Sequence, residues 1–201
     1  TTTTTTTTTF SPTHPDVVPV EGYVCTEKTC YWMPNETLSC PLSGCTHLPL
    51  LLGTDIENIF LQENKITEIP DLPNYYKLKY LDLANNEISV IAERAFNNLV
   101  SLETLILSGN QLTSLNDIGL YGLHSLKYLF LNGNLFKEIP PDAFADVETN
   151  LERLDLSSNK IERLHENSFE DLYKLRNLHL SENKINYLHP KQFTMLDDLQ
   201  W

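Results

Sequence analysis

The chain has 201 residues, a net charge of −13 and a mean hydropathy of −0.26, so it is long enough to form one domain with a sizeable hydrophobic core. Its longest apolar run, residues 48–52, is far shorter than the roughly 20 residues that a membrane-spanning helix needs. Nucleic acids and anionic membrane surfaces attract clustered lysines and arginines, and the net charge has the opposite sign. We therefore expect no nucleic-acid partner and no direct membrane insertion of this segment.

Residues 1–20 form a low-complexity segment rich in threonine. Nine threonines precede a stretch that contains Pro12 and Pro15. Such a tract buries too little apolar surface to fold alone, so it predicts a disordered stalk. Two interpretations stay open, an O-glycosylated, mucin-like stalk and an unmodified disordered tail.

The four cysteines all lie in a second segment, residues 21–55, at Cys25, Cys30, Cys40 and Cys45. An even number in one tight cluster predicts a disulfide-stapled cap and hence an oxidising, extracellular compartment. Zinc sites favour CxxC pairs, whereas both close pairs here are separated by four residues, so zinc is the less favoured interpretation. Four cysteines allow three disulfide connectivities, and all three stay open at this point.

The cap segment also contains the sequon Asn35-Glu36-Thr37. We expect it in an exposed loop, because it falls between cysteines of the cap. In a secreted chain Asn35 is then expected to carry an N-linked glycan. The alternative is an unmodified surface asparagine.

From Ile56 onward the sequence repeats. The units begin at these positions: Ile56, Leu78, Leu102, Leu126, Leu151, Leu175 and Leu199. Each complete unit opens with LxxLxLxxNx(I/L/F), and its period and consensus are those of leucine-rich repeats. The sequence predicts six complete repeats in residues 56–198 and the start of a truncated seventh in residues 199–201. Because Thr1 is not an initiator methionine, we expect a fragment of a longer, processed chain.

The spacing of the leucines predicts how each repeat folds. The xLxLx segment alternates, which is typical of a short strand with one face turned inward. One repeat cannot bury its apolar residues alone, whereas stacked repeats form one continuous core. We predict an α/β solenoid, a leucine-rich-repeat horseshoe with a parallel β-sheet on its concave face, an irregular or short helical convex side and a disulfide-stapled N-terminal cap. The following residues are expected to fill the core from the returning half of the units: Ile91, Phe96, Leu99, Leu164, Phe169, Leu172, Leu188, Phe193 and Leu196.

Two columns of polar residues are predicted to stabilise the stack. The first column is the asparagine after each strand: Asn64, Asn86, Asn110, Asn134, Asn159 and Asn183. An amide offers donors and an acceptor, so it can bond backbone groups of its own unit and of the adjoining one. Positions are counted from the first residue of each unit, so that Ile56 is at position one. The second column is strand position two, where the sign of the charge alternates: Glu57, Lys79, Glu103, Lys127, Glu152 and Arg176. We expect each of these charges to lie between opposite charges in a ladder that salt screens, and the alternative is coincidence.

Strand positions three and five should point to solvent from the concave face. They carry the candidate ligand-binding residues: Phe60, Tyr80, Ile106, Tyr128, Phe130, Arg153, Asp155 and His179. Clustered exposed aromatic residues are typical of a protein-binding surface, although they also suit the face of a sheet. We interpret these residues as a ligand site.

Two sets of residues invite a catalytic or a metal-binding interpretation. Asp155 and His179 occupy the same position in adjacent units, with serines close by. A catalytic triad also needs a sheltered nucleophile and an oxyanion hole, so we predict a ligand-contacting ion pair instead. His165 and His189 also share a repeat position, but no third ligand accompanies them. We expect no catalytic residue, no enzymatic activity, no metal site and no cofactor.

Residues 25–201 resemble the extracellular leucine-rich-repeat superfamily with cysteine-rich N-terminal caps, which includes small matrix proteoglycans and Toll-, Slit- and Lingo-like ectodomains. The repeat consensus and the clustered cysteines, followed by Leu48-Pro49, carry this resemblance. The short first unit, with its segment Ile69-Pro70-Asp71-Leu72-Pro73, is similar to small proteoglycans, whereas the later units are similar to Toll- and Slit-like ectodomains. The proteoglycan caps imply the pairing Cys25–Cys40 with Cys30–Cys45, in preference to the sequential pairing.

Repeats, cap and resemblance together predict an extracellular protein, either secreted, in the matrix, or the ectodomain of a cell-surface protein. We expect a binding module that recognises a matrix or cell-surface protein ligand on its concave face. The alternative, from a different class, is a structural matrix protein that organises fibrils as proteoglycans do.

Overall fold

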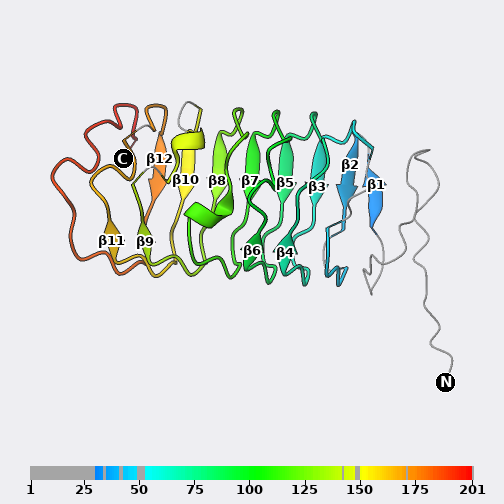
Figure 1. Ribbon diagram of the computed structural model, residues 1–201, viewed down its shortest axis with the longest axis horizontal. Helices are drawn as coiled ribbons and strands as arrows, with labels where there is room; N and C mark the ends of the chain where they lie inside the picture. The colour runs from blue at the N-terminus through cyan, green and yellow to red at the C-terminus, as the bar shows by residue number, and fades with distance from the viewer. Residues whose placement is uncertain are drawn as a thin grey trace, which may run out of the picture.

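The computed structural model describes residues 30–33, 35–40, 43–48, 53–141, 143–147, 150–170 and 172–200. The predicted threonine-rich stalk (residues 1–20) and Cys25 lie outside these residues. The described turns stack side by side into one elongated solenoid (Figure 1). Within the described part of the chain, no helix has the length and apolar character needed to cross a bilayer.

An eight-stranded sheet runs along one side of the described solenoid. Its strands, in spatial order, are β1 (Tyr31–Met33), β2 (Thr37–Ser39), β3 (Asn58–Phe60), β5 (Tyr80–Asp82), β7 (Thr104–Ile106), β8 (Tyr128–Phe130), β10 (Arg153–Asp155) and β12 (Asn177–His179). β1 and β2 are antiparallel, and every later pair of neighbours is parallel. The predicted parallel sheet is therefore confirmed, and the cap adds its own strands to the edge that the first repeat would otherwise expose.

The opposite side of the solenoid carries much shorter elements. They are the strand pairs β4 (Glu68–Ile69) with β6 (Val90–Ile91) and β9 (Glu138–Ile139) with β11 (Arg163–Leu164), and the 3₁₀ turns η1 (Asn116–Ile118) and η2 (Ala145–Val147). In Figure 1 the short strands lie along the edge below the main sheet. The predicted irregular or short helical convex side is confirmed, with two-residue strands in addition.

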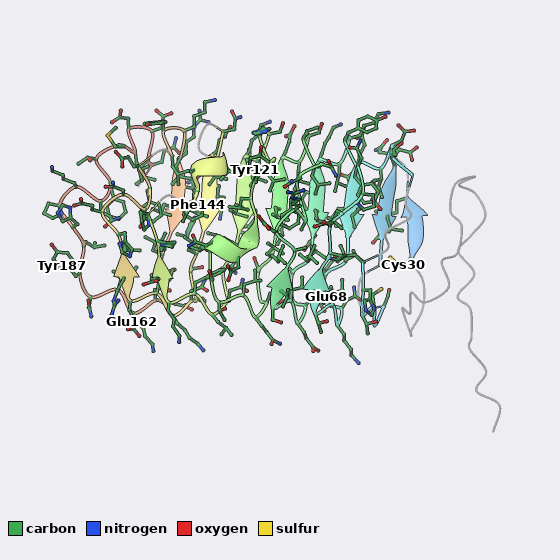
Figure 2. The ribbon with its side chains drawn as sticks, in the orientation of Figure 1. Cys30, Glu68, Tyr121, Phe144, Glu162 and Tyr187 are labelled. Carbon is green, nitrogen blue, oxygen red and sulfur yellow. A yellow bond between two sulfur atoms is a disulfide. The ribbon has the colours of Figure 1, made fainter. Side chains whose placement is uncertain are left out.

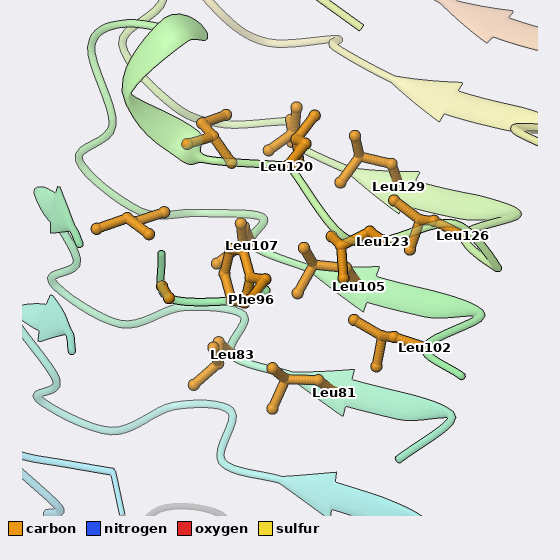
Figure 3. Close-up of a cluster of buried hydrophobic side chains, with 14 of the residues drawn as sticks. Leu81, Leu83, Phe96, Leu102, Leu105, Leu107, Leu120, Leu123, Leu126 and Leu129 are labelled. Atoms are coloured by element: carbon orange, nitrogen blue, oxygen red, sulfur yellow. The ribbon is translucent and has the colours of Figure 1, made fainter. Parts of the chain in front are cut away.

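The hydrophobic core lies between these two sides. The central residue of each inner strand points inward, as Leu105 does in Figure 3, where it packs within a cluster of buried leucines. The rings of Phe144, Phe169 and Phe193 stack through three successive turns, with centroids 6.2 Å and 6.0 Å apart. Leu188, predicted as a core residue, is 51% exposed, because no further complete turn covers it among the described residues.

The asparagine after each strand ties adjacent turns together. Nδ2 of Asn110 donates to the carbonyl oxygens of Leu107 in its own turn and Leu83 in the preceding turn, both at 3.0 Å. Its Oδ1 accepts the backbone N–H of Ile88 at 3.0 Å. The same arrangement recurs at Asn86, Asn134, Asn159 and Asn183. The predicted structural role of this column is confirmed, since each amide satisfies buried backbone groups in two turns.

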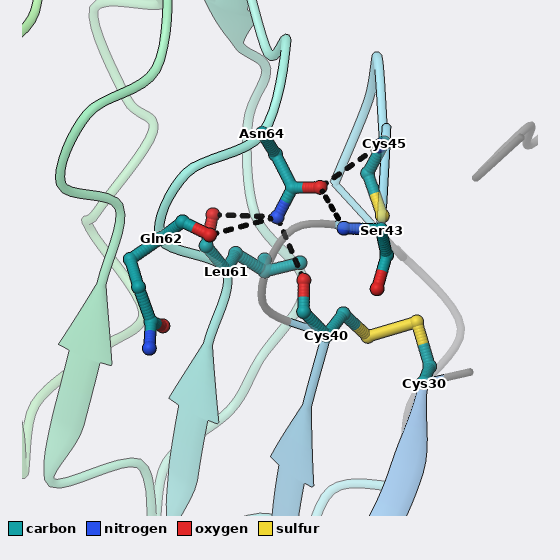
Figure 4. Close-up of a disulfide and its surroundings, with 7 residues drawn as sticks. All are labelled: Cys30, Cys40, Ser43, Cys45, Leu61, Gln62 and Asn64. Atoms are coloured by element: carbon teal, nitrogen blue, oxygen red, sulfur yellow. Dashed lines mark hydrogen bonds between the residues drawn. A yellow bond between two sulfur atoms is a disulfide. The ribbon is translucent and has the colours of Figure 1, made fainter. Parts of the chain in front are cut away.

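Asn64 extends the same column into the cap, as Figure 4 shows. Its Nδ2 donates to the carbonyl oxygen of Cys40 at 2.7 Å. Its Oδ1 accepts the backbone N–H groups of Ser43 at 3.0 Å and Cys45 at 2.9 Å. The cap is thus joined to the first repeat by the device that joins one repeat to the next.

The disulfide of the described cap joins Cys30 to Cys40 (Figure 4). β1 and β2 form an antiparallel hairpin whose register sets these two residues opposite each other, with their Cα atoms 4.2 Å apart. Both pairings implied by the resemblance to proteoglycan caps, Cys25–Cys40 and Cys30–Cys45, are therefore wrong. Cys45 is also disulfide-bonded.

Candidate ligand-binding surface

All eight candidate ligand-binding residues lie on the outward side of the eight-stranded sheet, which we call the concave face. The strand register aligns position three of each repeat in one column: Asn58, Tyr80, Thr104, Tyr128, Arg153 and Asn177. It aligns position five in a second column: Phe60, Asp82, Ile106, Phe130, Asp155 and His179. Neighbouring members of a column are about 5 Å apart, as strands in a sheet are. Residues that are far apart in the sequence thus form one continuous surface.

The first two repeats contribute an aromatic pair to this face. The ring centroids of Phe60 and Tyr80 are 5.0 Å apart and the rings are tilted by 35°, so their separation is that of interacting aromatic pairs. Phe60 is paired in register with Asp82 of the next strand. All three side chains are half-buried rather than fully exposed, because each shelters its neighbours on the sheet.

The middle of the face carries a second group, the central cluster, which consists of Ile106, Tyr128, Phe130 and Arg153. Ile106 and Phe130 are register partners, as are Tyr128 and Arg153. The guanidinium of Arg153 lies over the ring of Phe130, 5.4 Å from its centroid, which is a cation–π contact. Tyr128 is 37% exposed. The cluster therefore combines aromatic surface with a positive charge, and both are available at the middle of the sheet.

Asp155 and His179 are register partners on adjacent strands, but the predicted ion pair between them is not formed among the described residues. Asp155 Oδ1 instead accepts the backbone N–H of Ser157 at 3.0 Å and its hydroxyl at 2.6 Å. The hydroxyl of Ser157 is therefore bonded to a carboxylate and not to an imidazole. Ser157 and His179 therefore do not form a nucleophile–base pair.

Burial shifts the pKa of two groups on the concave face. It raises the pKa of the Tyr80 phenol, and the negative charge of Asp82 raises it further. Burial also raises the pKa of the Asp82 carboxyl, although the N–H of Ala84, which donates to Oδ1 at 2.9 Å, acts in the opposite direction. Sequence reasoning did not select Asp82 as a ligand residue. Its place beside Phe60 follows from the repeat register, but the burial that distinguishes it depends on how neighbouring side chains pack.

The alternating charges at strand position two form ion pairs between successive repeats. Lys79 Nζ lies 2.9 Å from Glu57 Oε2, and Lys127 Nζ lies 3.0 Å from Glu103 Oε2. The contact between Arg176 and Glu152 is longer, 3.6 Å. The hydrogen bond that Lys127 donates to Glu103 raises the pKa of Lys127, the negative charge of Glu103 raises it further, and the charge of Glu152 contributes less. The column is therefore made of separate pairs, each cation leaning toward the preceding repeat, rather than of evenly shared charges.

The two aligned histidines lie on the opposite side of the solenoid. His189 Nε2 is 3.5 Å from Glu166 Oε2. The described residues include no group of three or more candidate metal ligands. An open groove of about 210 Å³ lies nearby, lined by Glu162, Arg163, Leu164, His165, Asn186 and Tyr187. Figure 2 shows Glu162 on the edge that carries the short strands and Tyr187 at the end away from the cap.

The sequon asparagine lies in the turn between β1 and β2. Asn35 is exposed and has a positive φ of 63°. The hydroxyl of Thr37 donates to the carbonyl oxygen of Asn35 at 3.0 Å. An exposed side chain in a tight turn is accessible to modification, so the expectation of a glycan at Asn35 stays a prediction.

Stacked turns, one parallel strand per turn and an asparagine that bonds two turns define a leucine-rich-repeat solenoid with an open, aromatic concave face. Comparison with known families agrees: the Leucine rich repeat model matches residues 54–112, 101–148 and 149–201. The chain belongs to the leucine-rich repeat family.

Two solved structures that resemble this chain are both complexes. One contains Toll, from the Toll–Spatzle complex of Drosophila, with 26% identity and a TM-score of 0.63 over 71% of this chain. The other contains TLR13, from a TLR13–ssRNA13 complex, with 27% identity and a TM-score of 0.57 over 73% of this chain. This chain spans 19% of the Toll chain and 24% of the TLR13 chain. A general ligand-binding role for these repeats follows from the fold and the family.

The expectation that a nucleic-acid partner is excluded is wrong. TLR13, which is similar over most of this chain, was solved in a complex with single-stranded RNA. Net charge is a sum over the whole chain, whereas a nucleic acid responds to the cations on the face that it contacts. A net charge of −13 therefore does not exclude this class of ligand.

Proposed function

We propose that this chain is part of an extracellular or cell-surface binding module that recognises a protein ligand on its concave face. The observation that carries the proposal is the central cluster. Ile106, Tyr128 and Phe130 supply apolar and aromatic surface, and Arg153 lies over one of the rings. Tyrosine and arginine are among the residues most enriched at the energetic centres of protein interfaces. The similarity to Toll in the Toll–Spatzle complex supports the same conclusion.

The charges around the central cluster also favour a protein ligand. Lys79, Lys127 and Arg176 each lie beside a glutamate of the preceding repeat. Cations that are already paired attract a polyanion less than unpaired ones do. Arg153 lies at position three of the concave face, apart from these ion pairs. Its guanidinium is stacked on an aromatic ring, which is the arrangement expected at a protein interface.

We further propose the following division of the chain: a stalk in residues 1–20, a cap in residues 21–55, six repeats in residues 56–198 and the start of a seventh in residues 199–201. The Cys30–Cys40 disulfide supports an oxidising, extracellular compartment for the cap. The exposed turn at Asn35 supports N-glycosylation there. Ligand binding, not catalysis, is the activity that this arrangement supports.

A binding panel tests the proposal. Purified secreted and cell-surface ectodomains, fibrillar collagen and a single-stranded RNA are each measured by biolayer interferometry against the chain and its variants. We expect an ectodomain to bind, and we expect Tyr128→Ala and Phe130→Ala each to weaken it about fivefold or more, the effect of ~1 kcal/mol. Glu138→Ala, an exposed residue of β9 on the opposite side, is the matched control and should change affinity less than about twofold.

Other outcomes of the panel contradict the proposal. Equal losses in the Tyr128 and Glu138 variants would remove the concave face as the binding surface. Binding of collagen alone would favour the alternative role in organising fibrils. Binding of RNA alone would replace the protein ligand with a nucleic acid.

A further inference from the structure

Two aspartates occupy position five of the concave face, and their surroundings differ. Asp155 accepts two hydrogen bonds from Ser157, at 3.0 Å and 2.6 Å, and Arg153 precedes it on the same face of the strand. At Asp82 the corresponding positions hold Ala84 and Tyr80. Asp82 therefore receives the backbone N–H of Ala84 at 2.9 Å, but neither a hydroxyl nor a neighbouring guanidinium. The carboxylate of Asp82 thus lacks the hydroxyl donor and the neighbouring positive charge that stabilise the carboxylate of Asp155.

The groups beside Asp82 have the electronic character that attracts a cation. Phe60 is its register partner, and Tyr80 precedes it on the same face of the strand, with the two rings 5.0 Å apart. The faces of aromatic rings are negative and bind ammonium and guanidinium groups. Gln62, two residues beyond Phe60 on the same face, has a side-chain oxygen without a hydrogen-bond donor among the described residues. A carboxylate and two aromatic rings therefore adjoin one another on this face.

We propose that Phe60, Tyr80 and Asp82 form an acidic subsite that receives a cationic side chain, lysine or arginine, from the protein ligand. This inference rests on the proposed function, because it names the chemistry of the ligand at one end of the concave face. The central cluster begins on the next strand, where Ile106 is the register partner of Asp82, and it extends from there to β10. A ligand that spans both places a basic residue at the subsite and apolar residues on the cluster.

The energetics of Asp82 agree with this assignment. Burial raises the pKa of its carboxyl, so the ionised form is destabilised in the free chain. A bound cation supplies the missing opposite charge in a half-dry environment, where ion pairing and cation–π attraction are stronger than in open water. The subsite is therefore complementary to a positive group and repels a negative one.

The test uses small probes that differ in charge but hardly in shape. Nα-acetylarginine amide is titrated against the chain, with Nα-acetylcitrulline amide as its neutral match, and the ring signals of Phe60 and Tyr80 are followed by NMR. We expect the arginine probe to bind about fivefold or more tighter than the citrulline probe. In Asp82→Asn and in Phe60→Leu this preference should disappear. Asp117→Asn removes the same charge at an exposed residue of η1 and should retain it.

Equal binding of the two probes to the unmodified chain would overturn the subsite. So would a preference that survives in both Asp82→Asn and Phe60→Leu, or one that Asp117→Asn abolishes. Because the probes do not depend on Tyr128 or Phe130, the subsite can fail while the panel still finds a protein ligand on the concave face, and the two proposals are separable.

Discussion

Replacing Asn110 with alanine removes one rung of the asparagine column from the middle of the stack. The wild-type amide donates to the carbonyl oxygens of Leu83 and Leu107 and accepts the N–H of Ile88, each at 3.0 Å and buried. The two carbonyl groups keep a partner, because Asn86 also donates to Leu83 and the next asparagine in the column also donates to Leu107. The N–H of Ile88 loses the acceptor that it has in the described structure, so the variant buries an unsatisfied donor.

The size of the effect follows from these contacts. An unsatisfied buried donor costs about 1–3 kcal/mol, and each of the two lost carbonyl hydrogen bonds contributes about 0.5–1.5 kcal/mol. We therefore expect Asn110→Ala to lower the free energy of unfolding by about 2–6 kcal/mol, as measured by urea denaturation followed by circular dichroism. Gln111→Ala, at the exposed adjacent position, should change it by less than about 0.5 kcal/mol.

A gradient along the column provides an independent check. Asn183 makes the same kind of contacts, but its surroundings are only partly buried. Water can hydrogen-bond to the backbone groups that Asn183→Ala exposes. Asn183→Ala should therefore lower the free energy of unfolding less than Asn110→Ala does. If Asn110→Ala lowers the free energy of unfolding by less than about 1 kcal/mol, or if both variants lower it equally, burial does not determine how much each asparagine stabilises the fold.

Three further substitutions test other parts of the structure. Lys127→Glu puts a third carboxylate between Glu103 and Glu152, so the melting temperature should fall at low salt and recover in high salt; a salt-independent fall would show that packing alone sets the stack. The carboxyl of Asp82 has a folded-state pKa above its ordinary value of 3.8, so the stability it contributes is present below that value and is lost as the pH rises through the folded pKa. Urea denaturation at pH 3 and pH 7 should therefore find Asp82→Asn gaining stability relative to the parent chain at the higher pH, and an unchanged difference would contradict this. Gly122→Ala adds a Cβ 2.7 Å from a backbone oxygen of the preceding turn at a φ of +89°, which should cost about 2–4 kcal/mol of stability by the same assay; a loss below about 1 kcal/mol would mean that the turn relaxes.

The repeats and their parallel sheet were predictable because the leucines recur in the sequence with a fixed spacing. The alternation around Leu81 and Leu105 sets the strands, and the register of the repeats then decides which residues share the concave face. The asparagine column was predictable for the same reason, since one side chain per repeat follows each strand. In both cases a local pattern is repeated often enough to determine a long-range contact.

The irregular parts were not predictable from spacing. The Cys30–Cys40 disulfide depends on the register of the β1–β2 hairpin, which the distances between cysteines do not encode. Strand position eight adopts positive φ values in every repeat, even where its residue is Glu63, Ser158 or Glu182. The turn geometry imposes this conformation against the local preference of those side chains, so no glycine signal announces it.

The candidate site was predictable in position and only partly in chemistry. Repeat register brings Tyr128, Phe130 and Arg153 together, as expected. The partnership of Asp155 with Ser157 rather than with His179 depends on side-chain rotamers, which sequence does not specify.

The central claim is that the ligand contacts the concave face, and site-specific photo-cross-linking measures this most directly. A benzophenone amino acid is introduced in place of Tyr128 in the central cluster or, as the control, in place of Val90, which is 58% exposed in β6 on the opposite side. Each variant is irradiated with the ectodomain that binds most tightly in the panel. We predict a covalent adduct from position 128 and none from position 90. An adduct from position 90 alone, or equal yields from both, would contradict binding on the concave face.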